Sequence, residues 1–159
     1  FDELILQQKE DFYFHGRNKR PPLDNVNAML SFGYSLLAGM CGGTLEAVGL
    51  DPYVGFFHTD RPGRMSLALD LMEEFRSVKV DRFVLTLINK RIMKPEYFLT
   101  KENGAVIMTE EGRKAFLSAW QGKKTGDDYA SIFRRKDRVG NGSICTEHAA
   151  GTFPARGSG

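Results

Sequence analysis

The sequence contains few cysteines. Cys41 and Cys145 are the only two, they lie far apart, and neither belongs to a Cys-x-x-Cys pair, which argues against a disulfide framework and a structural zinc site. Chains of this kind are typical of reducing compartments, and we expect a cytoplasmic protein. No basic-then-apolar signal segment stands at the start, and no uninterrupted apolar run approaches the roughly 18 residues of a membrane helix. No membrane association is therefore predicted.

The chain also lacks a strong net charge. Its formal net charge of +2 is too small to indicate a nucleic-acid partner by itself. The basic residues nevertheless gather in groups. These groups are Arg17, Lys19 and Arg20; Arg61 and Arg64; Lys90, Arg91 and Lys94; and Arg134, Arg135, Lys136 and Arg138. Such groups are more often solvated surface than binding sites. They indicate nucleic-acid binding only where catalytic or metal-binding residues lie beside them.

The length and composition are those of one globular domain, with 159 residues of which 42% are apolar and 26% charged. Because the first residue is Phe1 rather than Met, we expect the chain to begin inside a domain. Residues 139–159 are rich in Gly, Ala and Ser, and they have too little periodic apolar content to offset the entropy of ordering. We therefore expect a domain over residues 1–124 and a disordered or non-native tail over residues 125–159.

Apolar residues recur at helical spacing in most of the predicted domain. Asp24 follows two prolines and can cap a helix that continues to Gly49, although Gly42 and Gly43 could break its middle. One face of this helix carries small or polar residues, which permit the close approach of another helix or of a phosphate backbone. These residues are Asn27, Ser31, Tyr34 and Ala38.

Shorter elements complete the predicted fold. Ser66 is expected to cap a second helix. Its predicted buried stripe consists of Leu67, Leu71, Phe75 and Val78. Further helices are predicted over residues 1–10, 83–88 and 109–120. The pair Asn103-Gly104 favours a tight turn, so residues 97–108 are predicted to form a hairpin. The fold class is therefore mainly α, a helical bundle with a small β-hairpin.

Three side chains could form a metal site. Asp70 and Glu73 are three residues apart on a predicted helix, so their carboxylates can converge on one point. With the imidazole of His58 they offer the oxygen and nitrogen donors that suit Mg²⁺ or Mn²⁺. Such an ion can activate a nucleophile for attack on a phosphodiester. Arg61 and Arg64 would then hold the DNA backbone.

A structural interpretation of the same residues stays open. Two acids on the polar face of an amphipathic helix are ordinary, and a histidine beside Phe57 is by default hydrogen-bonded to backbone. Glu74 is favoured as the solvated partner of Arg76 or Lys79. Residue spacing alone therefore does not decide between a metal-dependent nuclease and a non-catalytic helical DNA-binding or assembly module.

A longer ordered pattern resembles a known family. Its residues are Arg17, Lys19, Arg20, Pro21, Pro22, Asp24, Val26, Asn27, Ala28, Leu30, Ser31, Gly33 and Tyr34, then Gly49, Leu50, Asp51, Pro52, Gly55, Phe56 and His58, then Ser66, Leu67, Asp70, Leu71, Glu73 and Arg76. In this combination the chain from about Phe1 to Gln121 resembles the universal CRISPR-associated endonuclease and integrase, which inserts new spacers into the repeat array. The ordered combination is far more specific than any short motif within it.

The resemblance implies a helical catalytic domain that holds Mg²⁺ or Mn²⁺ through a glutamate, a histidine and a second acid. Carried over by position, the histidine is His58 and the second acid is Glu73, with Asp70 as an adjacent catalytic acid. The first glutamate belongs to a Glu-Gly motif that we expect upstream of Phe1. The metal ligands expected in this chain are then His58 and Glu73.

The resemblance also implies partners. The family acts on double-stranded DNA, forms homodimers and works with a small ferredoxin-like CRISPR-associated protein that bridges two dimers. The DNA-binding residues expected here are Arg17, Lys19, Arg20, Arg61 and Arg64. The implied function is a metal-dependent DNA endonuclease and integrase of CRISPR spacer acquisition, a form of adaptive antiviral defence. The alternative is the non-catalytic DNA-binding or assembly module.

Overall fold

The computed structural model describes residues 1–18, 20–58 and 61–124. The chain divides into two units, Phe1–Trp120 and Gln121–Gly159. Of the second unit, only the end of the last helix belongs to the described part. Lys19, which the sequence assigned to DNA binding, and the predicted tail over residues 125–159 lie outside the described residues.

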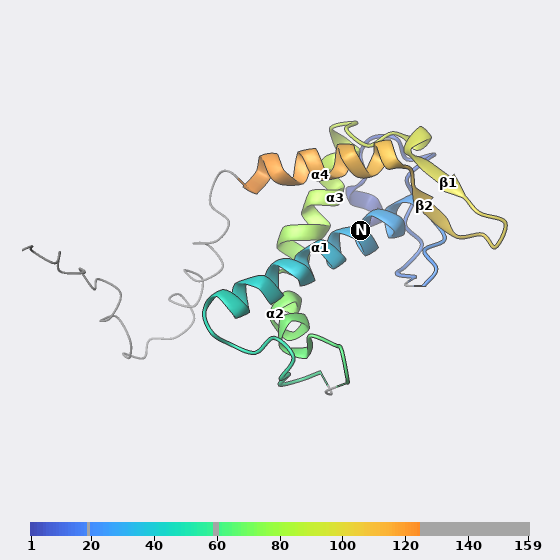
Figure 1. The fold of residues 1–159 in the computed structure, drawn as a ribbon. Coiled ribbons are helices and arrows are strands. Elements are labelled where there is room, and N and C mark those ends of the chain that lie inside the picture. Colours follow the sequence, from blue (N-terminus) through green and yellow to red (C-terminus); the bar gives the residue numbers. More distant parts are fainter. Residues whose placement is uncertain (19, 59–60, 125–159) are drawn as a thin grey trace, which may run out of the picture. The chain divides into compact units, whose positions relative to one another are not determined.

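The longest element is helix α1, Asn25–Ala47 (Figure 1). The carboxylate of Asp24 accepts the backbone N–H of Asn27 at 2.7 Å, which confirms the predicted cap. The helix passes through Gly42 and Gly43 without a break. Close packing explains the glycine at position 42, because a Cβ added there would lie 2.9 Å from Sδ of Met65.

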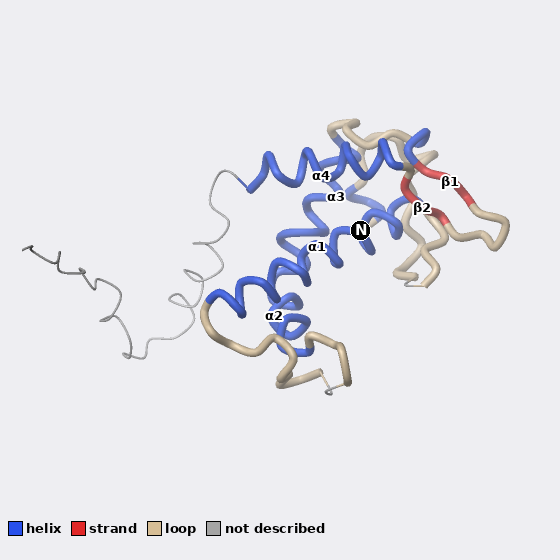
Figure 2. The backbone as a smooth tube through the Cα atoms, viewed as in Figure 1, coloured by secondary structure: helices blue, strands red, loops and turns tan. Residues whose placement is uncertain are grey.

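Further elements follow α1 along the chain, and several of them pack against it (Figure 2). They are α2, Ser66–Arg76; a π-helical segment, Ser77–Asp81; α3, Arg82–Asn89; β1, Phe98–Thr100; β2, Val106–Met108; and α4, Glu110–Lys124. The two strands form an antiparallel hairpin in which Phe98 lies opposite Met108. The mainly α fold with a small β-hairpin is therefore confirmed.

Aromatic side chains from three helices meet in the core. The ring of Phe116 on α4 lies 5.2 Å from Phe32 of α1 and 5.2 Å from Phe83 of α3, both edge-on. Trp120 lies 5.1 Å from Phe83 in the same kind of arrangement. Such edge-to-face pairs add to the stabilisation that burial provides, so α4 holds α1 and α3 together.

The predicted helix over residues 1–10 is wrong. A single 3-10 turn, Asp2–Leu4, is followed by irregular chain. Asn89 of α3 binds this segment, because its Oδ1 accepts the N–H of Leu6 at 2.8 Å and its amide donates to the carbonyl of Leu4 at 3.0 Å. Hydrogen bonds to a distant helix thus replace the local ones that the apolar spacing predicted.

The buried face of α2 also differs from the prediction. Ala68, Met72 and Phe75 are buried, whereas Leu67 and Leu71 are only half-buried. Of the predicted stripe, Phe75 lies in the core. The buried set keeps the expected helical spacing but is shifted around the helix axis, because the packing partner on α1 selects the face.

The prediction that Ser66 caps α2 is also wrong. Ser66 is the first helical residue rather than the cap, and Met65 at the cap position makes no side-chain capping bond. The carbonyl of Pro52 accepts the N–H groups of Leu67 and Ala68 at 3.0 and 3.3 Å. A loop carbonyl therefore satisfies donors that a side chain was expected to satisfy.

Within the described part of the chain, α1 is long and apolar enough to cross a membrane by length and composition alone. This finding does not contradict the prediction, which concerned uninterrupted apolar runs, because polar residues such as Asn27 and Ser31 interrupt α1. Half of its most apolar window is buried inside the domain, and a helix that is apolar on several faces is typical of a protein core as well as of a membrane span.

Gly33 allows α1 to approach the π-helical segment closely. A Cβ at this position would lie 2.6 Å from Cγ1 of the fully buried Val80 and 3.4 Å from Cζ of Phe116. We expect Gly33→Ala to lower the free energy of unfolding by roughly 1–3 kcal/mol through overpacking. Chemical denaturation followed by circular dichroism measures the change.

The matched control is Gly43→Ala in the same helix, where an added Cβ would meet no described atom within 4 Å. Alanine has the higher helix propensity, so this variant is expected to gain up to about 1 kcal/mol. Equal stabilities of the two variants would contradict the packing role of Gly33.

Candidate active site

The loop between α1 and α2 carries His58 and lies directly against the start of α2. Gly55 makes this approach feasible, because a Cβ there would lie 2.4 Å from Cβ of Ser66 and 2.6 Å from the carbonyl oxygen of His58. The Pro52 carbonyl, which accepts two N–H groups of α2, fixes the other end of the contact. The loop is thereby held against the helix that carries both predicted acids.

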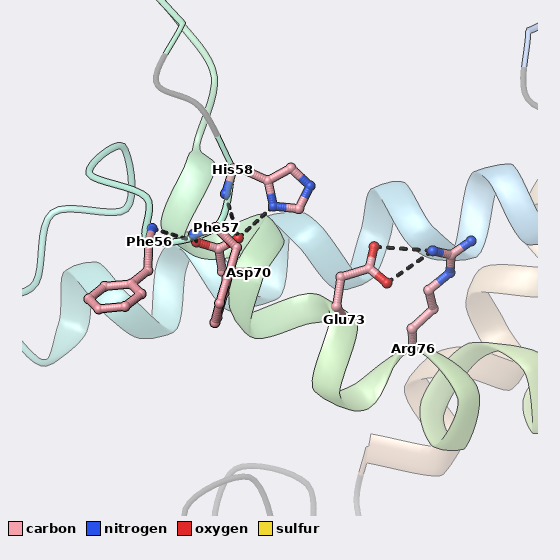
Figure 3. Close-up of polar contacts among 6 residues, drawn as sticks. All are labelled: Phe56, Phe57, His58, Asp70, Glu73 and Arg76. Carbon is pink, nitrogen blue, oxygen red and sulfur yellow. Dashed lines mark hydrogen bonds and ion pairs between the residues drawn. The ribbon is translucent and has the colours of Figure 1, made fainter.

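Asp70 holds the loop through its side chain (Figure 3). Its Oδ2 accepts the N–H groups of Phe56 and Phe57 at 2.6 and 2.9 Å, and its Oδ1 accepts the N–H of His58 at 3.1 Å. The imidazole Nδ1 of His58 lies 2.5 Å from the same Oδ1. A carboxylate offers about four acceptor positions, so these contacts use the full capacity of Asp70.

The hydrogen bonds also determine the charge of Asp70. Its side chain is 7% exposed, and this burial would raise the pKa of the carboxyl. The opposing hydrogen bonds from the His58 ring and from the backbone N–H groups of Phe57, Phe56 and His58 outweigh burial and hold the pKa well below its usual value of 3.8. Asp70 is therefore a carboxylate at neutral pH.

The contact with Asp70 orients the imidazole of His58. An ionised carboxylate can only accept, so the ring proton lies on Nδ1 and the lone pair of the neutral ring lies on Nε2. The side chain of His58 is 29% exposed, and Nε2 points away from Asp70 (Figure 3). Carboxylates hold metal-binding histidines in proteins in the same way.

Glu73 has different neighbours. Nη1 of Arg76 donates to both of its carboxylate oxygens at 3.1 and 3.0 Å, and the Glu73 side chain is 46% exposed. The guanidinium of Arg76 lies 4.4 Å from the ring centroid of Tyr34 on α1. The hydroxyl of Tyr34 in turn donates to Asp81 at 2.5 Å, so Glu73 is held through a chain of three residues, Arg76, Tyr34 and Asp81. Of the two partners that the sequence offered for Glu74, Arg76 or Lys79, Arg76 pairs with Glu73 instead.

The two predicted acids do not converge on one point. In Figure 3 the Asp70 carboxylate faces the loop, whereas the Glu73 carboxylate faces Arg76. The described residues contain no group of three His, Cys, Asp or Glu side chains that could hold a metal ion. The prediction that the carboxylates of Asp70 and Glu73 converge on one point is therefore wrong. The assignment of His58 and Glu73 as metal ligands stays a prediction.

The predicted DNA-binding arginines fall into two classes. Arg17 is part of the scaffold, since its guanidinium donates to Oδ1 of Asn27 at 2.7 Å and to Oγ of Ser31 at 3.0 Å. Arg20 and Arg61 are exposed and Arg64 is half-buried. Arg17 and Arg20 line a cleft that also borders Glu73.

Sequence reasoning missed the residues that hold the site together. From the sequence, Gly55, Tyr34 and Arg76 all belong to the family pattern. Beyond that pattern, Gly55 has no predicted role, Tyr34 lies only on the polar face of the long helix, and Arg76 is only one of the two possible partners of Glu74. The three-residue spacing between Glu73 and Arg76 was an available signal for their pairing. No local pattern indicated that Gly55 touches Ser66 or that Arg76 lies over Tyr34, because these contacts join separate elements.

Asp70→Asn keeps the side-chain shape and removes the charge. Because the folded pKa lies below the usual 3.8, the carboxylate stabilises the fold above pH 3.8, and this contribution is lost as the pH falls from there toward the lowered value. We expect the variant to be less stable near neutral pH, with a difference that shrinks below pH 3.8. Urea unfolding at a series of pH values measures it.

Glu74→Gln is the control, because Glu74 is an exposed acid on the same helix. We expect it to change stability little at any pH. A loss in Asp70→Asn that stays constant down to strongly acidic pH would contradict the lowered pKa.

The sequence is similar to CRISPR-associated proteins. Residues 1–122 match the family model of CRISPR associated protein Cas1. The chain is 56% identical over 124 residues to a CRISPR-associated endonuclease Cas1 of Rhodospirillum rubrum, covering 78% of this chain and 36% of that protein. It is 47% identical over 140 residues to the CRISPR-associated endonuclease Cas1 of Leptospira interrogans, covering 88% and 55% respectively. The chain thus spans about a third to a half of these relatives.

Solved structures agree with this assignment. A Cas1 protein from Thermotoga maritima aligns with a TM-score of 0.75 at 28% identity, covering 87% of this chain and 45% of that one. A casposase bound to an integration product aligns with a TM-score of 0.63 at 33% identity, covering 69% and 33%. The helices, the hairpin and the His58 loop described above therefore belong to a chain of the Cas1 family.

Proposed function

We propose that this chain carries part of the metal-dependent DNA endonuclease and integrase site of a Cas1 protein that acts in CRISPR spacer acquisition, in antiviral defence. Relatives named as endonucleases and the likeness to a casposase bound to an integration product support this proposal. The observation that carries it is the His58–Asp70 pair, because it leaves Nε2 of a fixed imidazole free to bind a ligand.

His58 through Nε2 and Glu73 through its carboxylate would hold the ion, Mg²⁺ or Mn²⁺. One imidazole nitrogen with carboxylate oxygen is a donor set that fits such ions. When bound, a divalent ion supplies Lewis-acid activation of a nucleophile and neutralises charge on the phosphate. Asp70 keeps the His58 ring in the orientation that presents Nε2, and Arg76 restrains the Glu73 carboxylate. A glutamate outside the described residues would complete the ligand set.

The proposed substrate is double-stranded DNA, with Arg17, Lys19, Arg20, Arg61 and Arg64 as backbone contacts. The attacking group is a terminal 3′-hydroxyl and the attacked bond a phosphodiester of the repeat. The whole protein is proposed to act in the cytoplasm as a homodimer with a small ferredoxin-like CRISPR-associated partner.

A non-catalytic DNA-binding or assembly role is the second candidate. It is favoured by the saturation of Asp70 with hydrogen bonds and by the lack of a three-ligand group among the residues that the structure describes. Two protein ligands bind a divalent ion weakly. The chain by itself would then bind DNA without cleaving it.

The first test is metal-dependent cleavage. We expect a protein extended upstream to include the predicted Glu-Gly motif to cleave DNA with Mn²⁺ or Mg²⁺. His58→Ala should reduce this cleavage by more than the roughly 10–100-fold that loss of a ligand's hydrogen-bonding partner costs, because a ligand itself is removed. Manganese binding by electron paramagnetic resonance should weaken in parallel, while circular dichroism shows an intact fold.

His15→Ala provides the comparison, since His15 is an exposed loop histidine that contacts Tyr13. This variant is expected to cleave DNA and bind manganese as before. Unchanged cleavage and unchanged manganese binding in His58→Ala would contradict the assignment of His58 as a metal ligand.

A second test concerns Arg61 and Arg64. If each contacts one phosphate of duplex DNA, replacing both with Gln should reduce the slope of log affinity against log salt by about 1.8, at about 0.9 per contact. Fluorescence anisotropy at several salt concentrations gives the slope. An unaltered slope would mean that the two arginines are solvated surface.

A further inference from the structure

Asp81 lies outside the site described above and is joined to it by a series of side-chain contacts. Its Oδ1 accepts the hydroxyl of Tyr34 at 2.5 Å. The guanidinium carbon of Arg76 lies 4.4 Å from the centroid of the Tyr34 ring, and Arg76 donates to both carboxylate oxygens of Glu73 at 3.1 and 3.0 Å (Figure 3). The contact series therefore runs from Asp81 through Tyr34 and Arg76 to Glu73, a predicted metal ligand.

Core packing fixes the far end of this contact series. Asp81 ends the π-helical segment Ser77–Asp81, and the residue before it, Val80, is fully buried. Val80 lies so close to Gly33 of α1 that a Cβ added to the glycine would be 2.6 Å from its Cγ1. Because Tyr34 directly follows Gly33, the same contact brings Asp81 and Tyr34 together. The core thus determines the position of the Asp81 carboxylate.

The protons of the contact series have one arrangement at neutral pH. Burial and the hydrogen bond to Asp81 raise the pKa of Tyr34, so its hydroxyl keeps the proton that it donates. Burial would lower the pKa of Arg76, but the interactions with Tyr34 and Glu73 outweigh burial and raise it. Arg76 therefore stays a guanidinium. Its charge is paired with Glu73, while the hydroxyl proton of Tyr34 is paired with Asp81.

Arg76 needs this support because its side chain is long and has a positively charged neighbour. Holding an arginine side chain in one conformation costs conformational entropy. The guanidinium of Arg17 lies over the same Tyr34 ring, 5.3 Å from its centroid, and like charges repel each other. Burial and the charge of Arg76 lower the pKa of Arg17, whereas the charge of Asp81 acts in the opposite sense. Loss of Asp81 would release the Tyr34 ring and leave more of the repulsion between the two guanidinium groups unopposed.

We propose that Asp81 and Tyr34 are positioning residues for Glu73, which hold Arg76 in place so that the Glu73 carboxylate keeps the orientation in which it binds the divalent ion. The inference rests on the proposed function, in which Glu73 is a metal ligand. Loss of a ligand's own hydrogen-bonding partner costs roughly 10–100-fold in metal affinity or activity. Asp81 and Tyr34 act through Arg76, one step further from the ligand, so the expected loss is several-fold.

The first measurement uses the chain without divalent metal, so that failure of the metal site cannot affect it. A guanidinium that is held by hydrogen bonds rotates slowly and gives separate Nη–H signals in ¹H–¹⁵N NMR, whereas a free one gives averaged signals. Tyr34→Phe keeps the ring and removes only the hydroxyl, and Asp81→Asn keeps an acceptor and removes only the charge. We expect separate Arg76 signals in the unaltered chain and averaged signals in both variants, with circular dichroism showing an intact fold.

The second measurement uses the protein extended upstream and follows DNA cleavage as Mn²⁺ is added. Asp81→Asn should need several-fold more Mn²⁺ for half-maximal cleavage and reach the unaltered rate at saturating Mn²⁺, because only the orientation of a ligand is disturbed. KM for DNA should stay the same, since Asp81 is not among the residues that line the cleft beside Glu73. His58→Ala, which lacks a ligand, should not recover. Tyr34→Phe repeats the test in case Asp81→Asn does not fold.

Two control variants separate positioning from other effects. Tyr97→Phe alters another half-buried tyrosine with a cation near its ring, since Nζ of Lys94 lies 6.0 Å from the Tyr97 centroid. Glu74→Gln removes an exposed acid next to Glu73 in the sequence and outside the contact series. We expect both variants to keep separate Arg76 signals and the unaltered Mn²⁺ requirement.

Three results would overturn the positioning role. The first is a set of Arg76 signals that both variants leave unchanged. The second is a loss of cleavage that saturating Mn²⁺ does not restore, which would make the role merely structural. The third is an equal Mn²⁺ requirement in Glu74→Gln and Asp81→Asn, which would reduce the effect to nearby charge. An extended protein that binds no Mn²⁺, with Arg76 signals that average as expected, would instead contradict the proposed function and confirm that Asp81 and Tyr34 hold Arg76.

Discussion

The Asp70 carboxylate is the interaction on which the site depends. Three successive backbone N–H groups and one imidazole point at its two oxygens. Without that charge the four hydrogen bonds would weaken, because a bond to an ionised acceptor is stronger than one to a neutral acceptor. The same contacts hold the backbone of Phe56 and Phe57 inward and leave both side chains 87% exposed. One acid thus fixes the loop and the imidazole together.

The site and the core share helix α1. Gly33 faces Val80 and Phe116 in the core, and the next residue, Tyr34, donates its hydroxyl to Asp81. Val80 and Asp81 are likewise neighbours, at the end of the π-helical segment. The close approach at Gly33 therefore sets the Tyr34–Asp81 distance, and through Tyr34 the position of Arg76. π-helical segments are often found beside functional sites, and here one links core packing to Glu73.

Local chemistry explains which parts of the fold the sequence predicted. Asp24 as a cap and Asn103-Gly104 as a turn act within a few residues, and the structure confirms the helix and the hairpin that they indicate. Partners far along the chain explain the errors. Asn89 holds the N-terminal segment in a non-helical form, and the loop carbonyl of Pro52 replaces the predicted cap at Ser66. Neither partner can be identified from the spacing of apolar residues.

Asp70 and Glu73 show why spacing alone could not assign the site. Both are acids on one helix, three residues apart, yet the donors around them differ. Asp70 accepts four hydrogen bonds, which fill the roughly four acceptor positions of a carboxylate. Glu73 accepts one from Arg76 on each oxygen, so each oxygen keeps a lone pair. Only Glu73 can bind a cation without giving up a hydrogen bond, and Asp70 acts through His58.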